Sequence, residues 1–160
     1  MPESARWFCL SAAVIVLDYV TKVAVLQSFA PGEGRAVAPF FNLVLVFNKG
    51  AAFSFLATAQ GWQTLFFSAI ATVASAVISF LIVRHANKSL FCTGLALILG
   101  GALGNLYDRV VYGHVVDFLD FHVAGWHWPA FNVADSAITV GAGILIFESF
   151  LHKRSNETPA

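Results

Sequence analysis

Residues 62–83 read WQTLFFSAIATVASAVISFLIV and contain no charged side chain. The hydrocarbon core of a bilayer is about 30 Å thick, and a helix needs roughly 20 apolar residues to cross it. The segment has this length and this composition. It therefore predicts a membrane-spanning helix, and it indicates that lipid is the solvent for much of the remaining chain.

Three further stretches of similar character lie on either side of this segment. They cover residues 7–27, 89–107 and 134–151. Hydrophobic residues make up 58% of the chain and charged residues 11%, whereas about a quarter of the residues are charged in an ordinary soluble domain. A soluble chain of this length could not hide so much apolar surface. We therefore predict an all-α membrane protein with four transmembrane helices. This excludes a disordered chain, a coiled coil, a soluble enzyme and, with a net charge of zero, a nucleic-acid partner.

The distribution of Lys and Arg predicts how the helices are oriented, because cytoplasmic loops carry an excess of these residues. A four-helix topology places five of them on one side and three on the other; the five are Arg6, Arg84, Lys88, Lys153 and Arg154, and the three are Arg35, Lys49 and Arg109. We expect one integral membrane domain over residues 1–160, with both termini cytoplasmic and outer connections at 28–61 and 108–133. Charged residues interrupt the stretch 7–27, so we expect a retained helix there and not a cleaved signal peptide.

The first outer connection contains a segment with the character of a strand. Residues 41–47 are rich in β-branched and aromatic side chains, and Asn48-Lys49-Gly50 marks a turn after them. Aromatic side chains are enriched at membrane interfaces. We therefore expect a small extracytoplasmic β-cradle, meaning a sheet at the outer membrane surface, and a second outer loop over residues 108–133.

Ionisable groups at membrane depth cost a few kcal/mol each and are usually functional. Asp18 and Lys22 are four residues apart, so they share one face of the first helix. Two interpretations stay open for them, an internal ion pair that faces the bundle and a contact with substrate.

The third helix ends with small and polar residues in close succession. Gly100 and Gly104 form a pattern that allows close helix packing. Asn105 and Arg109 fall on one face at the same end of the helix, and packing does not explain either of them.

Asp117 and Asp135 are candidate catalytic acids. Asp117 lies in an apolar run after the third helix, and Asp135 opens the fourth. Two carboxyl groups brought together in an apolar site cannot both ionise easily, so one pKa rises and the pair shares a proton. The ionised acid can then take a proton from water while the protonated acid polarises a carbonyl, as in aspartic proteases. Alternatively, Asp135 is an ordinary helix-terminal acid and Asp117 a solvated loop residue. Asp108 and Asp120 compete for the catalytic role, and spacing does not exclude them.

Five segments resemble, in the same order, the motifs of the bacterial lipoprotein signal peptidase family, also called signal peptidase II. The segments are DYVTK at 18–22, NKGAAFS at 48–54, GGALGNLYDR at 100–109, VVDF at 115–118 and FNVADS at 131–136. The resemblance implies that Asp117 and Asp135 are the catalytic aspartates. It also implies a group of substrate-binding or supporting residues, namely Asn105, Arg109, Asn132, Asn48, Gly50, Ala51, Asp18, Lys22, Gly101 and Ala134.

The resemblance implies an intramembrane aspartic endopeptidase that removes the signal peptide from diacylglyceryl-modified prolipoproteins and cuts before the lipidated cysteine. It implies a place in the bacterial cytoplasmic (inner) membrane among membrane lipids, an active site near the outer leaflet, and inhibition by globomycin. We expect a monomer that uses no cofactor and no metal. Two alternatives stay open. One is a small proton-linked membrane transporter or channel subunit, in which buried Asp and Lys relay protons; the other is a membrane anchor for a complex.

Overall fold

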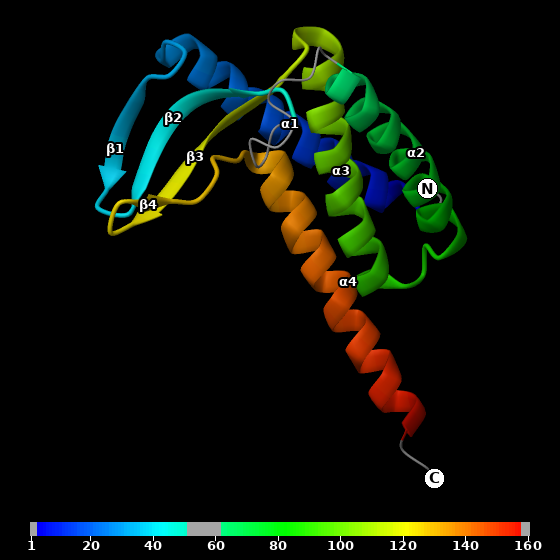
Figure 1. Ribbon diagram of the computed structural model, residues 1–160. Coiled ribbons are helices and arrows are strands. Elements are labelled where there is room, and N and C mark those ends of the chain that lie inside the picture. The colour runs from blue at the N-terminus through cyan, green and yellow to red at the C-terminus, as the bar shows by residue number, and fades with distance from the viewer. Residues whose placement is uncertain (1–2, 51–61, 158–160) are drawn as a thin grey trace.

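The computed structural model describes residues 3–50 and 62–157, and the side chains among them as far as residue 151. Figure 1 shows the arrangement of its helices and strands. In chain order the elements are α1 (Ala5–Ser28), β1 (Gly34–Ala38), β2 (Phe41–Asn48), α2 (Trp62–Arg84), α3 (Ser89–Tyr112), β3 (Val115–Val123), β4 (Trp126–His127) and α4 (Val133–Glu157).

Four helices are long and apolar enough to cross a membrane, which confirms the predicted fold class. The candidate spans are Ala5–Ser28, Trp62–Arg84, Ser89–Tyr112 and Val133–Leu151. Helix α3 is central and packs against α1, α2 and α4, whereas α2 packs mainly on α3 (Figure 1). The bundle is therefore organised around the helix that carries the glycine-rich motif.

Glycines let α3 approach its neighbours closely. A Cβ on Gly100 would lie 2.7 Å from the Cβ of Val14 on α1, and a Cβ on Gly101 would collide with the backbone carbonyl of Ala134 on α4. Both distances are too short for real side chains, so larger residues at these positions would push the helices apart. The predicted role of Gly100 in close packing is confirmed. Gly101 and Ala134 share this role on the side of α4.

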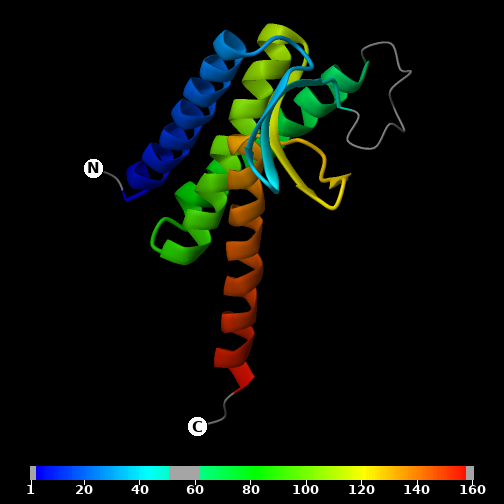
Figure 2. The same cartoon turned by 90° about the vertical axis from the view of Figure 1, so that its left-hand side faces the viewer.

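The sheet is antiparallel, with its strands in the order β1-β2-β3-β4. Strands β2 and β3 pair although α2 and α3 separate them in sequence, with Val46 opposite Asp117. Figures 1 and 2 show the sheet at one end of the bundle, beside α1 and the start of α4. Val25 of α1 and Val116 of β3 belong to the small apolar core that joins the sheet to the helices.

The second outer connection, predicted over residues 108–133, contains regular secondary structure. Helix α3 continues to Tyr112 and ends at Gly113, whose φ of 75° gives the left-handed conformation common after helices. The chain then forms β3 and joins the sheet. The strand was missed because its pairing partner, β2, lies on the other side of two helices in the sequence.

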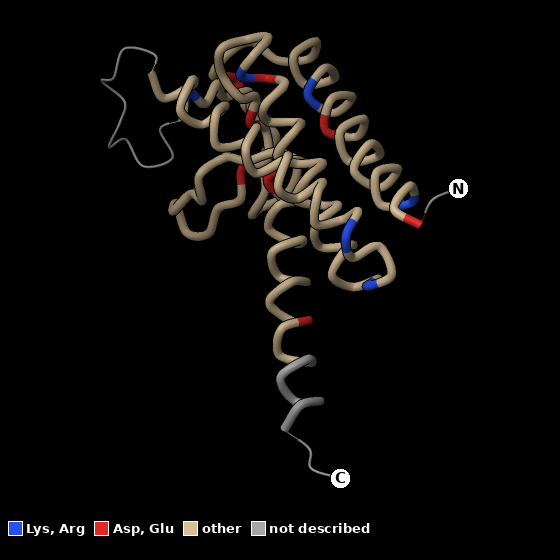
Figure 3. Tube along the Cα trace, turned by 90° about the vertical axis from the view of Figure 1, so that its right-hand side faces the viewer, with Lys and Arg blue, Asp and Glu red and all other residues tan. Residues whose placement is uncertain are grey.

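The opposite end of the bundle is basic. Arg6 lies in the first turn of α1, Arg84 ends α2, and Lys88 precedes α3. The indole Nε1 of Trp7 donates a hydrogen bond of 2.9 Å to the Ala86 carbonyl, which holds the start of α1 against the α2–α3 connection. Figure 3 shows this separation, with most acidic residues near the sheet.

Candidate active site

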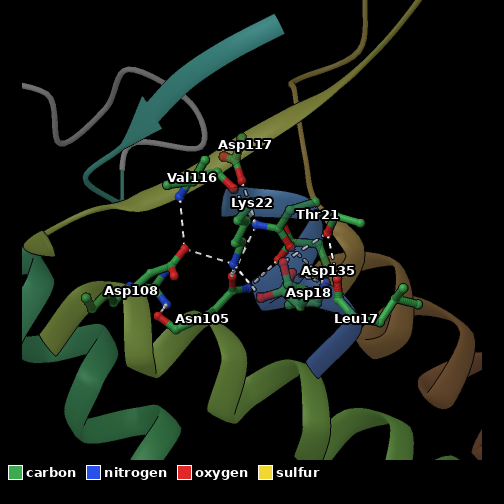
Figure 4. A network of polar contacts seen from close by, with 12 residues as sticks. Leu17, Asp18, Thr21, Lys22, Asn105, Asp108, Val116, Asp117 and Asp135 are labelled. Atoms are coloured by element: carbon green, nitrogen blue, oxygen red, sulfur yellow. Dashed lines mark hydrogen bonds and ion pairs between the residues drawn. The ribbon is translucent and has the colours of Figure 1, made fainter. Parts of the chain in front are cut away.

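A cluster of buried polar side chains lies where β3 and the ends of α3 and α4 meet α1 (Figure 4). Buried polar groups are costly unless they find hydrogen-bond partners, so each contact in the cluster constrains its geometry. The members that are at most 6% exposed are Asp18, Lys22, Asn105, Asp108, Asp117 and Asn132.

Two asparagine amides connect the two candidate acids. The Nδ2 of Asn132 donates to Asp117 Oδ1 at 2.8 Å and to Asn105 Oδ1 at 3.2 Å. The Nδ2 of Asn105 donates to Asp135 Oδ1 at 2.7 Å. The predicted acids Asp117 and Asp135 thus belong to one site, and each carboxylate is fixed by an amide that also contacts the other amide.

The first turn of α4 is capped from two directions, which fixes Asp135. The Oδ1 of Asn132 accepts the Asp135 backbone N–H at 2.9 Å, as an N-cap side chain does. The Oδ1 of Asp18 on α1 accepts the Ala134 N–H, also at 2.9 Å. Asp135 is therefore both an acid in the first turn of a helix and a member of the site. The interpretation as a helix-terminal acid and the interpretation as a site residue are compatible.

Lys22 and its partners form the base of the cluster. The Lys22 Nζ lies 2.6 Å from Asp18 Oδ2 and 2.8 Å from Asp108 Oδ2, and it donates to Asn105 Oδ1 at 3.2 Å. The Asp108 Oδ2 also accepts the Val116 N–H at 3.0 Å. The predicted Asp18–Lys22 ion pair is present, and it joins three helices to the sheet.

Asn48 approaches Asp117 from β2. Its Nδ2 donates to Asp117 Oδ2 at 3.0 Å, and its Oδ1 accepts the Gly50 N–H at 2.8 Å. Gly50 has a φ of +101°, which side-chain-bearing residues rarely adopt, and a Cβ there would lie 2.8 Å from the Phe67 ring. Ala51, the next predicted site residue, lies outside the described residues.

Arg109 lies on the face of α3 that also carries Asn105. Its Nη1 donates to the Asn105 carbonyl at 3.2 Å, and its guanidinium carbon lies 5.4 Å from the centroid of the Phe67 ring. The acidic neighbours of this guanidinium are Asp135, Asp117 and Asp108. Within residues 3–50 and 62–157 its buried Nε has no hydrogen-bond partner, so Arg109 keeps a donor available.

The environment of Asp117 favours its protonated form. Burial raises the pKa of this carboxyl, and the negative charge of Asp135 raises it further. The amides of Asn48 and Asn132 and the positive charge of Lys22 act in the opposite direction, and the result is a pKa of about 7. An acid with this pKa can donate a proton and accept one near neutral pH.

The competing acids have other partners. Asp108 pairs with Lys22, as described above. Asp120 lies three residues after Asp117 in β3, so its side chain leaves the opposite face of the strand. It accepts hydrogen bonds from Asn42 Nδ2 at 2.8 Å and from the His127 ring, also at 2.8 Å. No group of three or more His, Cys, Asp or Glu side chains in the described part of the chain could hold a metal ion.

A family model described as signal peptidase (SPase) II matches residues 10–151. The chain belongs to the signal peptidase II family. Its relatives include proteins named lipoprotein signal peptidase from Paraburkholderia phymatum, 57% identical over 150 residues, and Burkholderia mallei, 58% identical over 150 residues. Each of these alignments covers 94% of this chain and 90% of the relative.

Solved structures agree with the signal peptidase II assignment in fold. A bacterial membrane enzyme determined by the in meso method superposes with a TM-score of 0.82 and 31% identity, covering 98% of this chain and 93% of that one. A second such enzyme gives a TM-score of 0.79 and 30% identity, with 90% and 92% covered. The resemblance inferred from the five sequence segments is confirmed, and the chain is a multi-pass membrane protein of a peptidase family.

Several contacts of this signal peptidase II site could not be found by sequence reasoning. Three of these contacts join segments that are distant in sequence. Asp108 is a second partner of Lys22, Asp18 caps Ala134, and Phe67 lies against Arg109. The role of Asn132 had a local signal, because Asn is among the preferred residues at the position that caps the start of a helix.

Proposed function

We propose that this signal peptidase II family member is an aspartic endopeptidase that removes the signal peptide from diacylglyceryl-modified prolipoproteins and cuts before the lipidated cysteine. One observation carries the aspartic mechanism. Asp117 and Asp135 are joined through the amides of Asn132 and Asn105, and the pKa of Asp117 is raised to about 7.

The first step of the proposed mechanism divides the acid and base roles between the two carboxyl groups. Protonated Asp117 donates its proton to the carbonyl oxygen of the scissile peptide bond. The N-terminal end of α4 favours a negative charge on Asp135, so Asp135 is the carboxylate that takes a proton from water. The water oxygen then bonds to the carbonyl carbon, and a tetrahedral gem-diol forms.

The second step returns both acids to their starting states. Asp135 passes its proton to the nitrogen of the lipidated cysteine, and the C–N bond breaks. Asp117 recovers a proton from one hydroxyl of the gem-diol as the new carboxyl group forms. The products are the signal peptide with a free carboxyl end and the lipoprotein with a free cysteine amine. Each acid acts once as a donor and once as an acceptor, and the pKa of Asp117, about 7, suits this double role.

The surrounding polar groups position the acids and hold the substrate. The amides of Asn48, Asn132 and Asn105 fix the carboxylate planes by direct hydrogen bonds. Arg109, whose Nε has no hydrogen-bond partner among the described residues, is suited to bind a substrate carbonyl. Asp18 and Lys22 support the site from α1 through the Ala134 cap and the Asn105 contact. We propose the same supporting role for Gly50, Ala51, Gly101 and Ala134.

We propose that the sheet end faces the outer leaflet of the bacterial cytoplasmic membrane and that both termini are cytoplasmic. Arg6, Arg84 and Lys88 gather at the end of the bundle opposite the sheet, as the positive-inside rule requires for a cytoplasmic face. A signal peptide crosses the membrane as an apolar helix, and its lipidated cysteine is anchored in the outer leaflet, so a site at this depth meets the scissile bond. We propose a monomer that globomycin inhibits at the two aspartates. The transporter and anchor alternatives gain no support from the family match.

The decisive experiment is cleavage of a diacylglyceryl-modified prolipoprotein by the purified chain in detergent. We expect cleavage before the lipidated cysteine, inhibition by globomycin, and no product from the same prolipoprotein without its lipid. Asp135→Asn should lower the rate by at least about 10²–10⁴-fold, because no carboxylate remains to take the proton from water. Full activity of a folded Asp135→Asn variant would contradict the aspartic mechanism, and proton flux in liposomes without a peptide product would favour a transporter.

A further inference from the structure

An apolar pocket lies at the free end of the sheet, outside the polar cluster. It has a volume of about 590 Å³, which is in the range of small-molecule sites. We call it the aromatic pocket; its walls include Phe40, Phe121, Val123, Trp126, Trp128 and Phe131. Most of these side chains would be costly to expose to water, since Trp126 is 62% exposed and Trp128 57%. A surface of this kind is typical of a contact with lipid or with an apolar ligand.

Aromatic stacking gives the aromatic pocket a defined shape. The Phe121 ring stacks on Phe131 with centroids 5.9 Å apart and on Phe40 with centroids 6.5 Å apart. The two indoles meet edge to face, with centroids 5.8 Å apart. Phe131 is held by backbone hydrogen bonds to Phe118 and Leu119 of β3. The walls are thus preformed, which lowers the entropic cost of binding a flexible chain.

The depth of the aromatic pocket points to lipid. In both Figure 1 and Figure 2 the β3–β4 hairpin lies at the level of the first turns of α4 and does not project beyond the end of the bundle. Helix α4 is a membrane span that begins at Val133, five residues after Trp128. Tryptophan at the end of a span is typical of the membrane interface. The pocket is therefore open to acyl chains at the depth where glycerol esters lie.

The walls of the aromatic pocket are linked through the backbone to the candidate active site. Phe131 directly precedes Asn132, whose amide holds Asp117 at 2.8 Å. Phe121 and Asp117 lie on the same strand, β3. Phe121 and Phe131 therefore connect the pocket to the strand that carries Asp117 and to the residue that holds it.

We propose that the aromatic pocket binds the acyl chains of the substrate's diacylglyceryl group. This inference rests on the proposed function, in which the lipidated cysteine lies beside the scissile bond and its glycerol is a few bonds from the aspartates. The link of the pocket walls to Asn132 and to β3 favours this tethered lipid, which the scissile bond holds beside the aspartates, over an ordinary phospholipid, which nothing holds there. Binding of the chains would position the cysteine for cleavage.

The kinetic test compares two peptides of one sequence whose cysteine carries either two palmitoyl chains or two butyryl chains. For Trp128→Ala and Phe121→Ala we expect KM for the long-chain peptide to rise about tenfold, as for a single anchor side chain, with kcat and the short-chain KM unchanged within twofold. Trp62→Ala is the matched control, because Trp62 is 49% exposed at the start of α2 and lies outside the pocket. Equal changes for both peptides, or none, would overturn the inference.

A binding test separates this inference from the proposed function. The inactive Asp135→Asn chain is titrated in detergent with the long-chain peptide brominated on its acyl chains, and tryptophan fluorescence is recorded. We expect saturable quenching that excess unbrominated peptide reverses and that is absent in a Trp126→Phe, Trp128→Phe double variant. If brominated phosphatidylglycerol quenches equally and the peptide does not displace it, the pocket is a general lipid contact and the inference is wrong. If the wild type cleaves no peptide, the proposed function fails, while the quenching result still decides occupancy of the pocket.

Discussion

Asp117 and Asp120 lie three residues apart in β3, are both buried, and have opposite electrostatic properties. Asp117 is 2% exposed and Asp120 7%. Burial raises the pKa of both carboxyls, but the result for Asp117 is a pKa of about 7, whereas the pKa of Asp120 is below its ordinary value. Asn42 and His127 donate hydrogen bonds to Asp120, and His127 and His122 supply positive charge. Asp117 instead has the negative Asp135 as a neighbour. Burial and the charges of the neighbouring groups therefore act together to decide which of the two acids suits catalysis.

The comparison is tested most strongly by replacing each acid with its amide. Asp117→Asn should lower the rate of prolipoprotein cleavage by about 10²–10⁴-fold, the usual size of a lost acid or base contribution. Asp120→Asn should leave the rate within about threefold, because its contacts are confined to the far face of the sheet. The measurement is initial rate with a diacylglyceryl-modified substrate, on variants shown by circular dichroism to be folded. A strong loss in Asp120→Asn with activity in Asp117→Asn would reverse the assignment.

The buried Lys22 and the exposed Lys88 should differ strongly in how much they stabilise the fold. Lys22 is 2% exposed and contacts two carboxylates, so Lys22→Met leaves Asp18 and Asp108 buried without a counter-charge. Breaking a buried ion pair from one side costs about 3–5 kcal/mol, and we expect a correspondingly large fall in the thermal midpoint in detergent. Lys88→Met is the control, because Lys88 is exposed and should change the midpoint little. Equal midpoints for Lys22→Met and the wild type would show that the network is not structural.

The four spans and strand β2 could be predicted because their signals are local. An uncharged run such as 62–83 shows a span without reference to the rest of the chain, and residues 41–47 show β-branched and aromatic character. Strand β3 could not be predicted in this way. Its residues gain strand structure by pairing with β2, and the register that puts Val46 opposite Asp117 depends on how the whole bundle brings the two segments together.

The candidate site divides in the same way between local and distant contacts. The i, i+4 spacing of Asp18 and Lys22 correctly predicted a shared helix face, and the ion pair, one of the two interpretations left open, is present. The choice between Asp117 and Asp120 depended on the resemblance to signal peptidase II, because both acids lie in one apolar run and only strand pairing sets which face each one occupies. The amides that fix Asp117 come from β2 and from the start of α4, and no spacing rule connects three such segments.

The two acids should also affect stability with opposite dependence on pH, and the larger effect belongs to Asp117. A carboxyl whose pKa rises from about 4 in the unfolded chain to about 7 in the fold stabilises the protein fully below pH 4 and loses that contribution as the pH rises through 7. The loss is of order 2–4 kcal/mol. Asp117→Asn cannot ionise, so its thermal midpoint relative to the wild type should increase between pH 5 and pH 8. A constant difference across this range would show that the pKa of Asp117 is not raised.

The smallest expected effect has the reverse sign and belongs to Asp120. A carboxyl whose pKa is lowered in the fold stabilises the protein at pH values above about 4, the pKa of this group in the unfolded chain. It loses that contribution as the pH falls through its pKa in the folded protein. The His127 side chain is 52% exposed, so solvent screens the pair, and we expect it to contribute about 0.2–1 kcal/mol. Asp120→Asn should therefore lower the thermal midpoint slightly at pH 6, and the difference from the wild type should shrink towards pH 3. A difference that grows on acidification would mean that Asp120, like Asp117, is held in its protonated form, and the contrast between the two faces of β3 would then be lost.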